Sequence, residues 1–483
     1  MKKFGITCLI LLLAKSAPAA TSGEVAVEFA GGPRSVTYAL YLPEDLKKDE
    51  RLPLVLCAGG VPMEDDKYVR SSPADCHSEP WTRFASKHRF AILGLGFLFE
   101  EELWEQKQTY QFPHAWSGRA VDDILERVSA AYPVDKTRLF LYGVSGGAQF
   151  ANRYAFYRPE WVKAVAAHAA GSYDPPLAGI GARFLVTVGE FDNDPVLRKD
   201  MAEEFVRALA LFGIRHELVI VEGIAHIQTE KQDDLSRAFF AEARGDAPEA
   251  GIEEGKNESL VTLPMGLPAE EVFKHFPRAA ARTLRSSGEE LFLSYLYGPQ
   301  KKDFLTLHIK NGVFFNWGLN ARHEVVDEYL TEFLSGGILR GYPKTFEAIR
   351  RALNKLPQEP FMKVVDRDRP VIFLDVTTGG IARYANAVDF YFREDDPPAF
   401  IRGFYLIKLG RDLEEAESPD EIEGIIFHEL THHVLDHLRG PVDCGTEKEA
   451  NRLVKEWGFG EELKKASARF GAKSPEDSPC YDK

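Results

Sequence analysis

The sequence is poor in positive charge and has no long apolar run. Its 59 Lys and Arg residues are outnumbered by 74 Asp and Glu, which gives a formal net charge of −15. Nucleic-acid binding needs a basic face, so nucleic acid is excluded as the expected partner. No stretch reaches the roughly 20 apolar residues that a spanning helix needs, so we expect no integral membrane span. Internal repeats and sustained low-complexity segments are also absent, which excludes a repeat array.

The N-terminus has the order of a secretory signal peptide. Residues 1–3 are Met-Lys-Lys, residues 6–14 are an apolar core, and residues 17–19 are Ala-Pro-Ala. A basic start, a short apolar run and small residues are what signal peptidase recognises. We therefore predict a signal peptide over 1–19 and a periplasmic or secreted protein.

Cysteine is scarce, with 5 residues in the whole chain, and Cys8 lies inside the predicted signal peptide. Four remain after cleavage, and an even number in an oxidising compartment predicts disulfides. Of the three possible connectivities we favour Cys57–Cys76 with Cys444–Cys480, one bond in each half. Buried free thiols are the alternative.

The chain is too long for one ordinary core, since 483 residues exceed the usual size of a single domain. Residues 245–259 are rich in Gly and acidic side chains and poor in large apolar ones, which is typical of a solvated connector. We therefore predict a domain over 20–244, a linker over 245–259 and a second domain over 260–483.

The first half alternates strands with helices. Residues 25–42 have the alternation of a hairpin, and helices are expected over 121–131 and 196–212. Apolar β runs are expected as strands over 52–57, 90–95, 139–144, 162–168, 184–188 and 216–221. This order predicts an α/β fold with a mainly parallel sheet, whose site lies at the carboxyl ends of the strands.

The run 139–144 breaks into Gly143-Val-Ser145-Gly-Gly147 and continues as a helix. This pattern is a nucleophile elbow, in which a strained turn presents the serine hydroxyl at the top of a sheet beside a helix N-terminus. Ser145 is therefore the candidate nucleophile.

Two further residues have the positions that a serine nucleophile needs. Asp192 follows the strand 184–188, and His226 follows the strand 216–221, so the order is nucleophile, acid, base. The imidazole would accept the serine proton and the carboxylate would fix its tautomer. Asp194 is the alternative acid. The backbone N–H groups of Gly146 and Gly60 are the candidate oxyanion donors.

These motifs resemble the α/β-hydrolase superfamily over roughly residues 25–243. The resembling segments are Val-Leu-Cys-Ala-Gly-Gly60, Gly-Val-Ser145-Gly-Gly, Gly-Glu-Phe-Asp192 and Gly-Ile-Ala-His226. Within the superfamily the chain looks most like exported esterases of the feruloyl-esterase and polyhydroxybutyrate-depolymerase type. One departure is Ala58-Gly59 where many relatives have His-Gly. The resemblance implies acyl hydrolysis of a small ester or a polymeric acyl substrate.

The second half has a different chemical motif. Helices are expected over 327–334 and 345–356, strands over 370–375 and 403–409, and a further helix opens at Asp420. That helix contains His428-Glu429-Leu-Thr-His432. Histidines one turn apart project from one face and can hold Zn²⁺, while Glu429 can take a proton from a metal-bound water.

Two histidines do not complete a protein zinc site, so a third ligand is needed. Glu447 with Asn451 four residues on resembles the Glu-x-x-x-Asp pairing of gluzincin metallopeptidases. This resemblance, over roughly 360–470, implies an α+β zincin-like domain, Glu447 as the ligand and a peptide substrate. Glu449 is the competing ligand, and Asn451 replaces the usual Asp. His433 and His437 are interpreted as solvated helix positions or extra ligands.

The sequence thus predicts an exported two-domain hydrolase with serine esterase and zinc peptidase activities. A second hypothesis is a metallopeptidase whose hydrolase half only binds substrate. A third is a non-enzymatic surface adhesion or scaffold protein.

Overall fold

The computed structural model describes residues 21–29, 32–47, 49–193, 195–245, 260–278, 281–287, 289–366, 369–376, 386–391, 403–437 and 443–471. The predicted signal peptide over 1–19 lies outside these ranges. The chain divides into two compact units, Met1–Leu267 and Pro268–Lys483. Each unit is described by itself.

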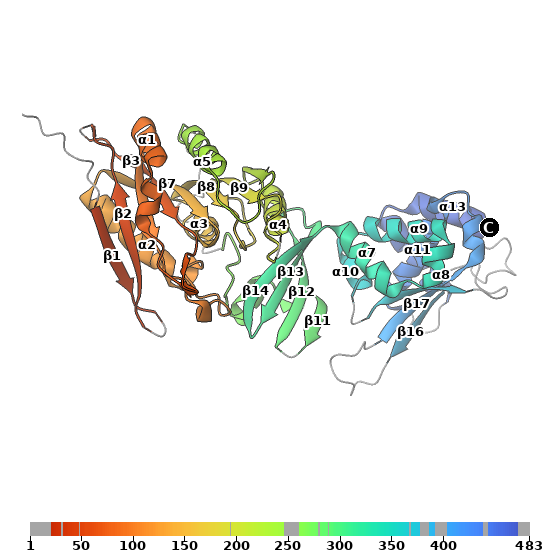
Figure 1. Ribbon diagram of the computed structural model, residues 1–483. Helices are drawn as coiled ribbons and strands as arrows, with labels where there is room; N and C mark the ends of the chain where they lie inside the picture. Colours follow the sequence, from red (N-terminus) through yellow and green to blue (C-terminus); the bar gives the residue numbers. More distant parts are fainter. Residues whose placement is uncertain are drawn as a thin grey trace, which may run out of the picture. The chain divides into compact units, whose positions relative to one another are not determined.

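Unit 1 is built on an eight-stranded sheet in the order β1-β2-β6-β3-β7-β8-β9-β10 (Figure 1). The pairs β1/β2 and β2/β6 are antiparallel, and all other neighbours are parallel. The mainly parallel α/β sheet predicted from the sequence is therefore confirmed. The strands are β1 Thr21–Val27, β2 Arg34–Tyr41, β3 Leu52–Ala58, β6 Ala91–Gly96, β7 Val134–Val144, β8 Val162–His168, β9 Arg183–Gly189 and β10 His216–Val221. A small hairpin, β4 Met63–Glu64 with β5 Lys67–Tyr68, lies apart from it.

The central strands are buried along their length, because both faces of a parallel sheet are covered. Every residue of β3 and β6 is buried, which is why these segments read as continuous apolar runs. Helices α1 and α5 join β7 in one aromatic cluster that includes Trp81, Phe140 and Phe240. The helices of this unit are α1 Glu79–His88, α2 Gly118–Ala131, α3 Gly146–Tyr157, α4 Arg198–Leu211 and α5 Glu230–Ala243.

One predicted disulfide is present. Cys57 on β3 is bonded to Cys76 in the 3₁₀ turn Pro73–His77, as predicted. The Cys444–Cys480 bond involves a cysteine outside the described part of the chain and stays a prediction.

The boundary of unit 1 lies beyond the predicted linker. Leu177 N donates to Val261 O at 2.7 Å, and Pro176 pairs with Thr262 in an antiparallel bridge. Residues 261–267 therefore pack with the first unit, and the division falls at Leu267 instead of residue 259.

Unit 2 contains two sheets and several helices. A four-stranded antiparallel sheet, which the sequence analysis did not predict, has the order β11-β12-β13-β14. A three-stranded sheet has the order β15-β17-β16, with β15/β17 parallel and β16/β17 antiparallel. The strands of unit 2 are β11 Arg282–Ser287, β12 Glu290–Tyr297, β13 Asp303–Lys310, β14 Val313–Asn320, β15 Val371–Val376, β16 Asn386–Tyr391 and β17 Gly403–Gly410. Its helices are α6 Ala269–His275, α7 Arg322–Phe333, α8 Gly336–Gly341, α9 Pro343–Lys355, α10 Gln358–Val364, α11 Pro419–Val434, α12 Cys444–Glu456 and α13 Gly460–Phe470.

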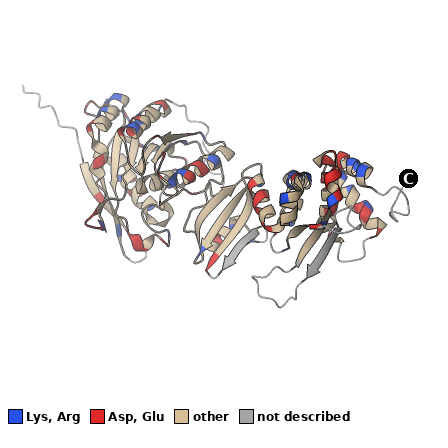
Figure 2. Cartoon of the chain, turned by 45° about the vertical axis from the view of Figure 1, so that its right-hand side comes forward, with Lys and Arg blue, Asp and Glu red and all other residues tan. Residues whose placement is uncertain are grey.

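Helix α11 forms the centre of this second unit. Ile422, Ile426, Phe427 and Leu430 are fully buried in a core shared with α7, α9 and β17. Among the described residues no helix is both long and apolar enough to cross a membrane. Acidic and basic segments are interspersed along the helices of both units (Figure 2).

Candidate active sites

Ser145 sits at a sharp turn between β7 and α3. Its backbone has φ 51° and ψ −114°, in the left-handed half of the map that a residue with a side chain rarely adopts. The turn is held from both sides, because Ser145 N donates to His168 O at 2.8 Å and Gln149 N donates to Ser145 O at 3.1 Å. The backbone bonds thus hold the serine in the strained turn that was predicted for a nucleophile elbow.

The glycines on both sides of Ser145 are required by close backbone contacts. A Cβ added to Gly143 would lie 2.3 Å from the carbonyl oxygen of Gly147. A Cβ added to Gly147 would lie 2.0 Å from the carbonyl oxygen of Ala58 on the neighbouring strand. Both distances are shorter than any tolerable contact with backbone, so only glycine lets the strand and helix close around the serine.

Ser145, His226 and Asp192 form a continuous hydrogen-bonded chain. The Ser145 Oγ–His226 Nε2 distance is 3.0 Å, and the His226 Nδ1–Asp192 Oδ2 distance is also 3.0 Å. A carboxylate only accepts hydrogen bonds, so the proton of a neutral imidazole lies on Nδ1 and the Nε2 lone pair faces the hydroxyl. That arrangement can withdraw the serine proton. The alternative acid, Asp194, lies outside the described residues.

The acid has a second partner that the sequence reasoning missed. Asp192 is 1 % exposed, and Arg198 Nη1 donates to its Oδ1 at 3.2 Å while His226 takes Oδ2. Both carboxylate oxygens are therefore bonded, which fixes the plane of the carboxylate. Arg198 is only six residues from Asp192 and is the first residue of α4, but no sequence motif marks the contact.

The two predicted oxyanion donors lie next to the serine. Gly146 follows Ser145 at the start of α3, and a Cβ added to Gly60 would lie 3.7 Å from the Ser145 Cβ. The Tyr110 hydroxyl lies beside Gly146, 2.5 Å from where a Cβ would be. It is buried and has no hydrogen-bond partner among the residues that the structure describes. Burial raises the pKa of Tyr110, so the phenol keeps its proton.

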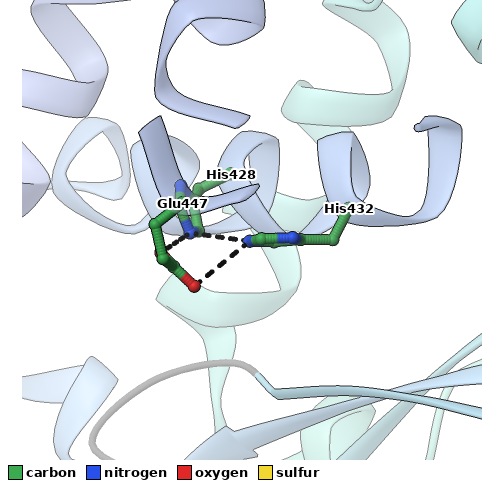
Figure 3. A group of neighbouring side chains, drawn as sticks. All are labelled: His428, His432 and Glu447. Atoms are coloured by element: carbon green, nitrogen blue, oxygen red, sulfur yellow. Dashed lines mark hydrogen bonds and ion pairs between the residues drawn. The ribbon is translucent and has the colours of Figure 1, made fainter. Parts of the chain in front are cut away.

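A second cluster lies in unit 2, where α11 faces the start of α12. His428 Nε2 and His432 Nε2 are 3.1 Å apart. The carboxylate of Glu447 lies 3.1 Å from His428 Nε2 and 3.6 Å from His432 Nε2. Figure 3 shows the three side chains pointing toward one another from the two helices, and their donor atoms all lie within 4.8 Å.

The competing carboxylate has a different contact. Glu449 Oε2 lies 3.2 Å from His437 Nε2, so it pairs with His437, whereas Glu447 faces the two histidines of the motif. His433 is buried, and its Nε2 lies 3.1 Å from the carbonyl oxygen of Lys363. The interpretation of His433 and His437 as solvated helix positions is therefore wrong, because both side chains are largely buried.

Burial and charge act on the clustered histidines in opposite senses. Burial lowers the pKa of His432 to about 4, helped by the neighbouring His428. Burial alone would lower the pKa of His428 too, but its bond with Glu447 and the charge of Glu429 outweigh this and raise that pKa. Glu429 is itself buried, at 9 % exposure.

Several solved structures of hydrolases are similar to this chain. An S-formylglutathione hydrolase from Agrobacterium tumefaciens is 16% identical with a TM-score of 0.36, and the match covers 48% of this chain and 98% of that one. A ferulic acid esterase is 14% identical with a TM-score of 0.37, covering 47% and 100%. An esterase from the archaeon Pyrobaculum calidifontis is 15% identical with a TM-score of 0.35, covering 47% and 87%. No protein-family model matches the sequence, and no curated protein matches it.

Proposed function

We propose that unit 1 is a serine hydrolase of the α/β-hydrolase class that cleaves carboxylic esters. The observation that carries this proposal is the chain Ser145–His226–Asp192, with 3.0 Å at both links. The strained backbone of Ser145 and the glycines around it add support, since an ordinary surface serine has no need of either.

Each residue has a defined role in the proposed reaction. His226 Nε2 accepts the Ser145 proton as Oγ bonds to the ester carbonyl carbon, and the carbonyl oxygen becomes an oxyanion facing the N–H groups of Gly146 and Gly60. His226 then gives the proton to the leaving alcohol as the ester bond breaks. Water repeats the sequence on the acyl-serine, which releases the acid and restores the hydroxyl. Asp192 stabilises the imidazolium.

An apolar rim around the proposed acid and base supports an ester with apolar groups. Phe191, Leu197 and Ile227 are 63 %, 55 % and 60 % exposed, whereas large apolar side chains are usually buried. Phe191 N donates to Ile224 O at 2.9 Å, so the loops that carry the acid and the base lie side by side. Exposed apolar surface next to a site favours apolar substrate contacts.

Labelling with a fluorophosphonate tests the serine site directly. We expect one adduct on Ser145, located by peptide mapping, and loss of the adduct in His226→Ala. A Ser172→Ala variant is the matched control, because Ser172 is a buried serine outside the triad. Casein cleavage without an adduct on Ser145 would instead favour a metallopeptidase whose first unit only binds substrate.

We also propose that unit 2 binds Zn²⁺ through His428, His432 and Glu447 and hydrolyses peptide bonds. The donor set fits, since two imidazoles and a carboxylate with convergent lone pairs leave a fourth position open, as in catalytic zinc sites. When bound, Zn²⁺ lowers the pKa of water and polarises a carbonyl. Glu429, one residue after His428, would accept the proton of the attacking water and pass it to the leaving amine.

Metal analysis tests the second site. Full-length protein stripped with a chelator and reloaded should contain one zinc per chain by inductively coupled plasma mass spectrometry. Zero zinc after reloading would overturn the proposal. If neither an ester nor a peptide panel is cleaved, the non-enzymatic adhesion or scaffold hypothesis is favoured.

The N-terminal sequence and the disulfide support export. The Cys57–Cys76 bond persists in an oxidising compartment, which agrees with a signal peptide over 1–19. N-terminal sequencing of the mature protein is expected to begin at Ala20.

A further inference from the structure

A second layer of polar side chains lies behind the histidine–carboxylate cluster of unit 2. His432 Nδ1 is 3.0 Å from His437 Nδ1, and His437 Nε2 is 3.2 Å from Glu449 Oε2. The His437 side chain is 8 % exposed, and the Glu449 side chain is 47 % exposed. The three residues thus form a chain that leads from the cluster toward solvent.

The donors and acceptors along this chain have a fixed direction. The Glu449 carboxylate only accepts, so His437 Nε2 carries the hydrogen of that bond. In a neutral imidazole the other nitrogen is then an acceptor, so His437 Nδ1 accepts from His432 Nδ1–H. His432 Nε2 is left with its lone pair, and this atom faces His428 and Glu447.

The two histidines of the motif differ in this second layer. His428 Nδ1 is 3.0 Å from Asn451 Oδ1, a neutral amide that accepts one hydrogen bond. His432 instead bonds to the imidazole of His437, which in turn bonds to the carboxylate of Glu449. Helix α12 supplies Glu447, Glu449 and Asn451, so side chains of one helix contact both histidines of the motif and His437.

We propose that His437 and Glu449 are positioning residues for a metal at this cluster. They hold His432 in the tautomer and ring orientation that present Nε2 to the ion. Through His437, the charge of Glu449 also makes His432 Nε2 a stronger electron-pair donor to the metal. Outer partners of this kind typically contribute 10–100-fold to metal affinity. This inference rests on the zinc site proposed above.

The test measures zinc affinity of the full-length protein by competition with a chromophoric chelator. In His437→Phe the ring keeps its bulk but loses both nitrogens, and we expect zinc to bind about 10–100-fold more weakly. His437→Gln restores an acceptor for His432 and should recover part of the affinity. Glu449→Gln keeps a hydrogen bond to His437 but removes the charge, so its zinc affinity should fall less than that of His437→Phe. Glu456→Gln, an exposed acid on the same helix, should bind like the parent protein.

A second readout separates positioning from folding. The Co²⁺-loaded protein should show a shifted visible spectrum in His437→Phe and an unshifted one in Glu456→Gln, while the metal-free proteins share one circular dichroism spectrum. If His437→Phe does not fold, Glu449→Gln and His437→Gln carry the same comparison.

The outcomes distinguish the two proposals. Normal zinc affinity and an unshifted Co²⁺ spectrum in both His437→Phe and Glu449→Gln would overturn the positioning role and leave the zinc site standing. Failure of the parent protein to bind zinc would overturn the site and the positioning role together.

Discussion

The two candidate sites are assembled in different ways. Ser145, Asp192 and His226 come from three loops that follow β7, β9 and β10, and 81 residues separate the serine from the histidine. His428, His432 and Glu447 come from two successive helices, α11 and α12. The first site exists only if the sheet has its observed strand order, whereas helical periodicity alone places both histidines of the second.

The sites also differ in how their carboxylates are held. Asp192 is buried, and both of its oxygens are bonded to side chains, one to His226 and one to Arg198. Glu447 is one-third exposed and shares its oxygens between two histidines. A buried carboxylate between an imidazole and a guanidinium is placed to orient the imidazole, whereas a partly exposed carboxylate that faces two imidazoles is placed to ligate a metal. The proposed role of each carboxylate thus follows from the side chains that its two oxygens contact.

The largest expected effect concerns the acid of the serine site. Asp192→Asn removes the charge and favours the wrong imidazole tautomer, and we expect kcat on p-nitrophenyl esters to fall about 10³–10⁴-fold. Asp194→Asn is the control and should keep the parental kcat. The reverse result, loss only in Asp194→Asn, would transfer the acid role to that residue.

The next largest effect concerns Gly147 in the turn around Ser145 and the stability of unit 1. Gly147→Ala places a Cβ against the Ala58 carbonyl, and overpacking of this kind should reduce the free energy of unfolding by about 3 kcal/mol. Ester hydrolysis should fall with it. Gly181→Ala is the matched control, since nothing lies within 4 Å of its added Cβ. Equal urea midpoints for the two variants would show that the turn can relax around a side chain.

The third prediction concerns Glu447, the proposed metal ligand. Glu447→Gln keeps the shape but removes the charge, and we expect zinc affinity to fall about 100-fold or more, beyond the usual effect of outer partners. Ester hydrolysis should be unchanged because the serine site belongs to the other unit. If zinc affinity falls in Glu449→Gln but not in Glu447→Gln, then Glu449 is the ligand.

The last prediction concerns the pH dependence of the stability of unit 1, which is the smallest effect when it is expressed per pH unit. His168 is fully buried between Thr187 and Ser236, and burial lowers its pKa to about 3. In the unfolded chain its pKa is near 6.5, so below that pH the unfolded state binds one more proton. The contribution of His168 to the free energy of unfolding is fully present above pH ~6.5. It falls by about 1.4 kcal/mol per pH unit on acidification toward pH 3.

His168→Gln removes that titration. We expect the free energy of unfolding of the variant to depend less steeply on pH between 6.5 and 4.5, whatever its value at neutral pH. Urea unfolding at several pH values checks this. Parallel stability curves for parent and variant would contradict the assignment.

Much of the fold of unit 1 follows from local pattern. The strands predicted over 162–168 and 216–221 match β8 and β10, because both segments are continuous or alternating apolar runs bounded by breaks. In contrast, β7 begins at Val134, five residues before the predicted run, because Asp135 and Lys136 are polar yet still belong to the strand. Polar residues at a strand start are invisible to an apolar pattern.

The second unit was less predictable. The sheet β11–β14 was not predicted, although Phe304, Leu305 and Leu307 on β13 are buried. Choosing between Glu447 and Glu449 depends on the rotation of α12 about its axis, which spacing alone does not define. The contacts of Arg198 with Asp192 and of His437 with His432 join residues close in the sequence, but they depend on how the chain turns between them and carry no sequence motif.

The central claim is that one chain holds two independent hydrolytic sites, and a paired-variant assay tests it most directly. Ser145→Ala and Glu429→Gln are compared with the parent protein on one ester panel and one peptide panel. The account predicts that Ser145→Ala loses only ester hydrolysis and Glu429→Gln loses only peptide hydrolysis. Loss of both activities in either variant, or retention of both in each, would contradict it.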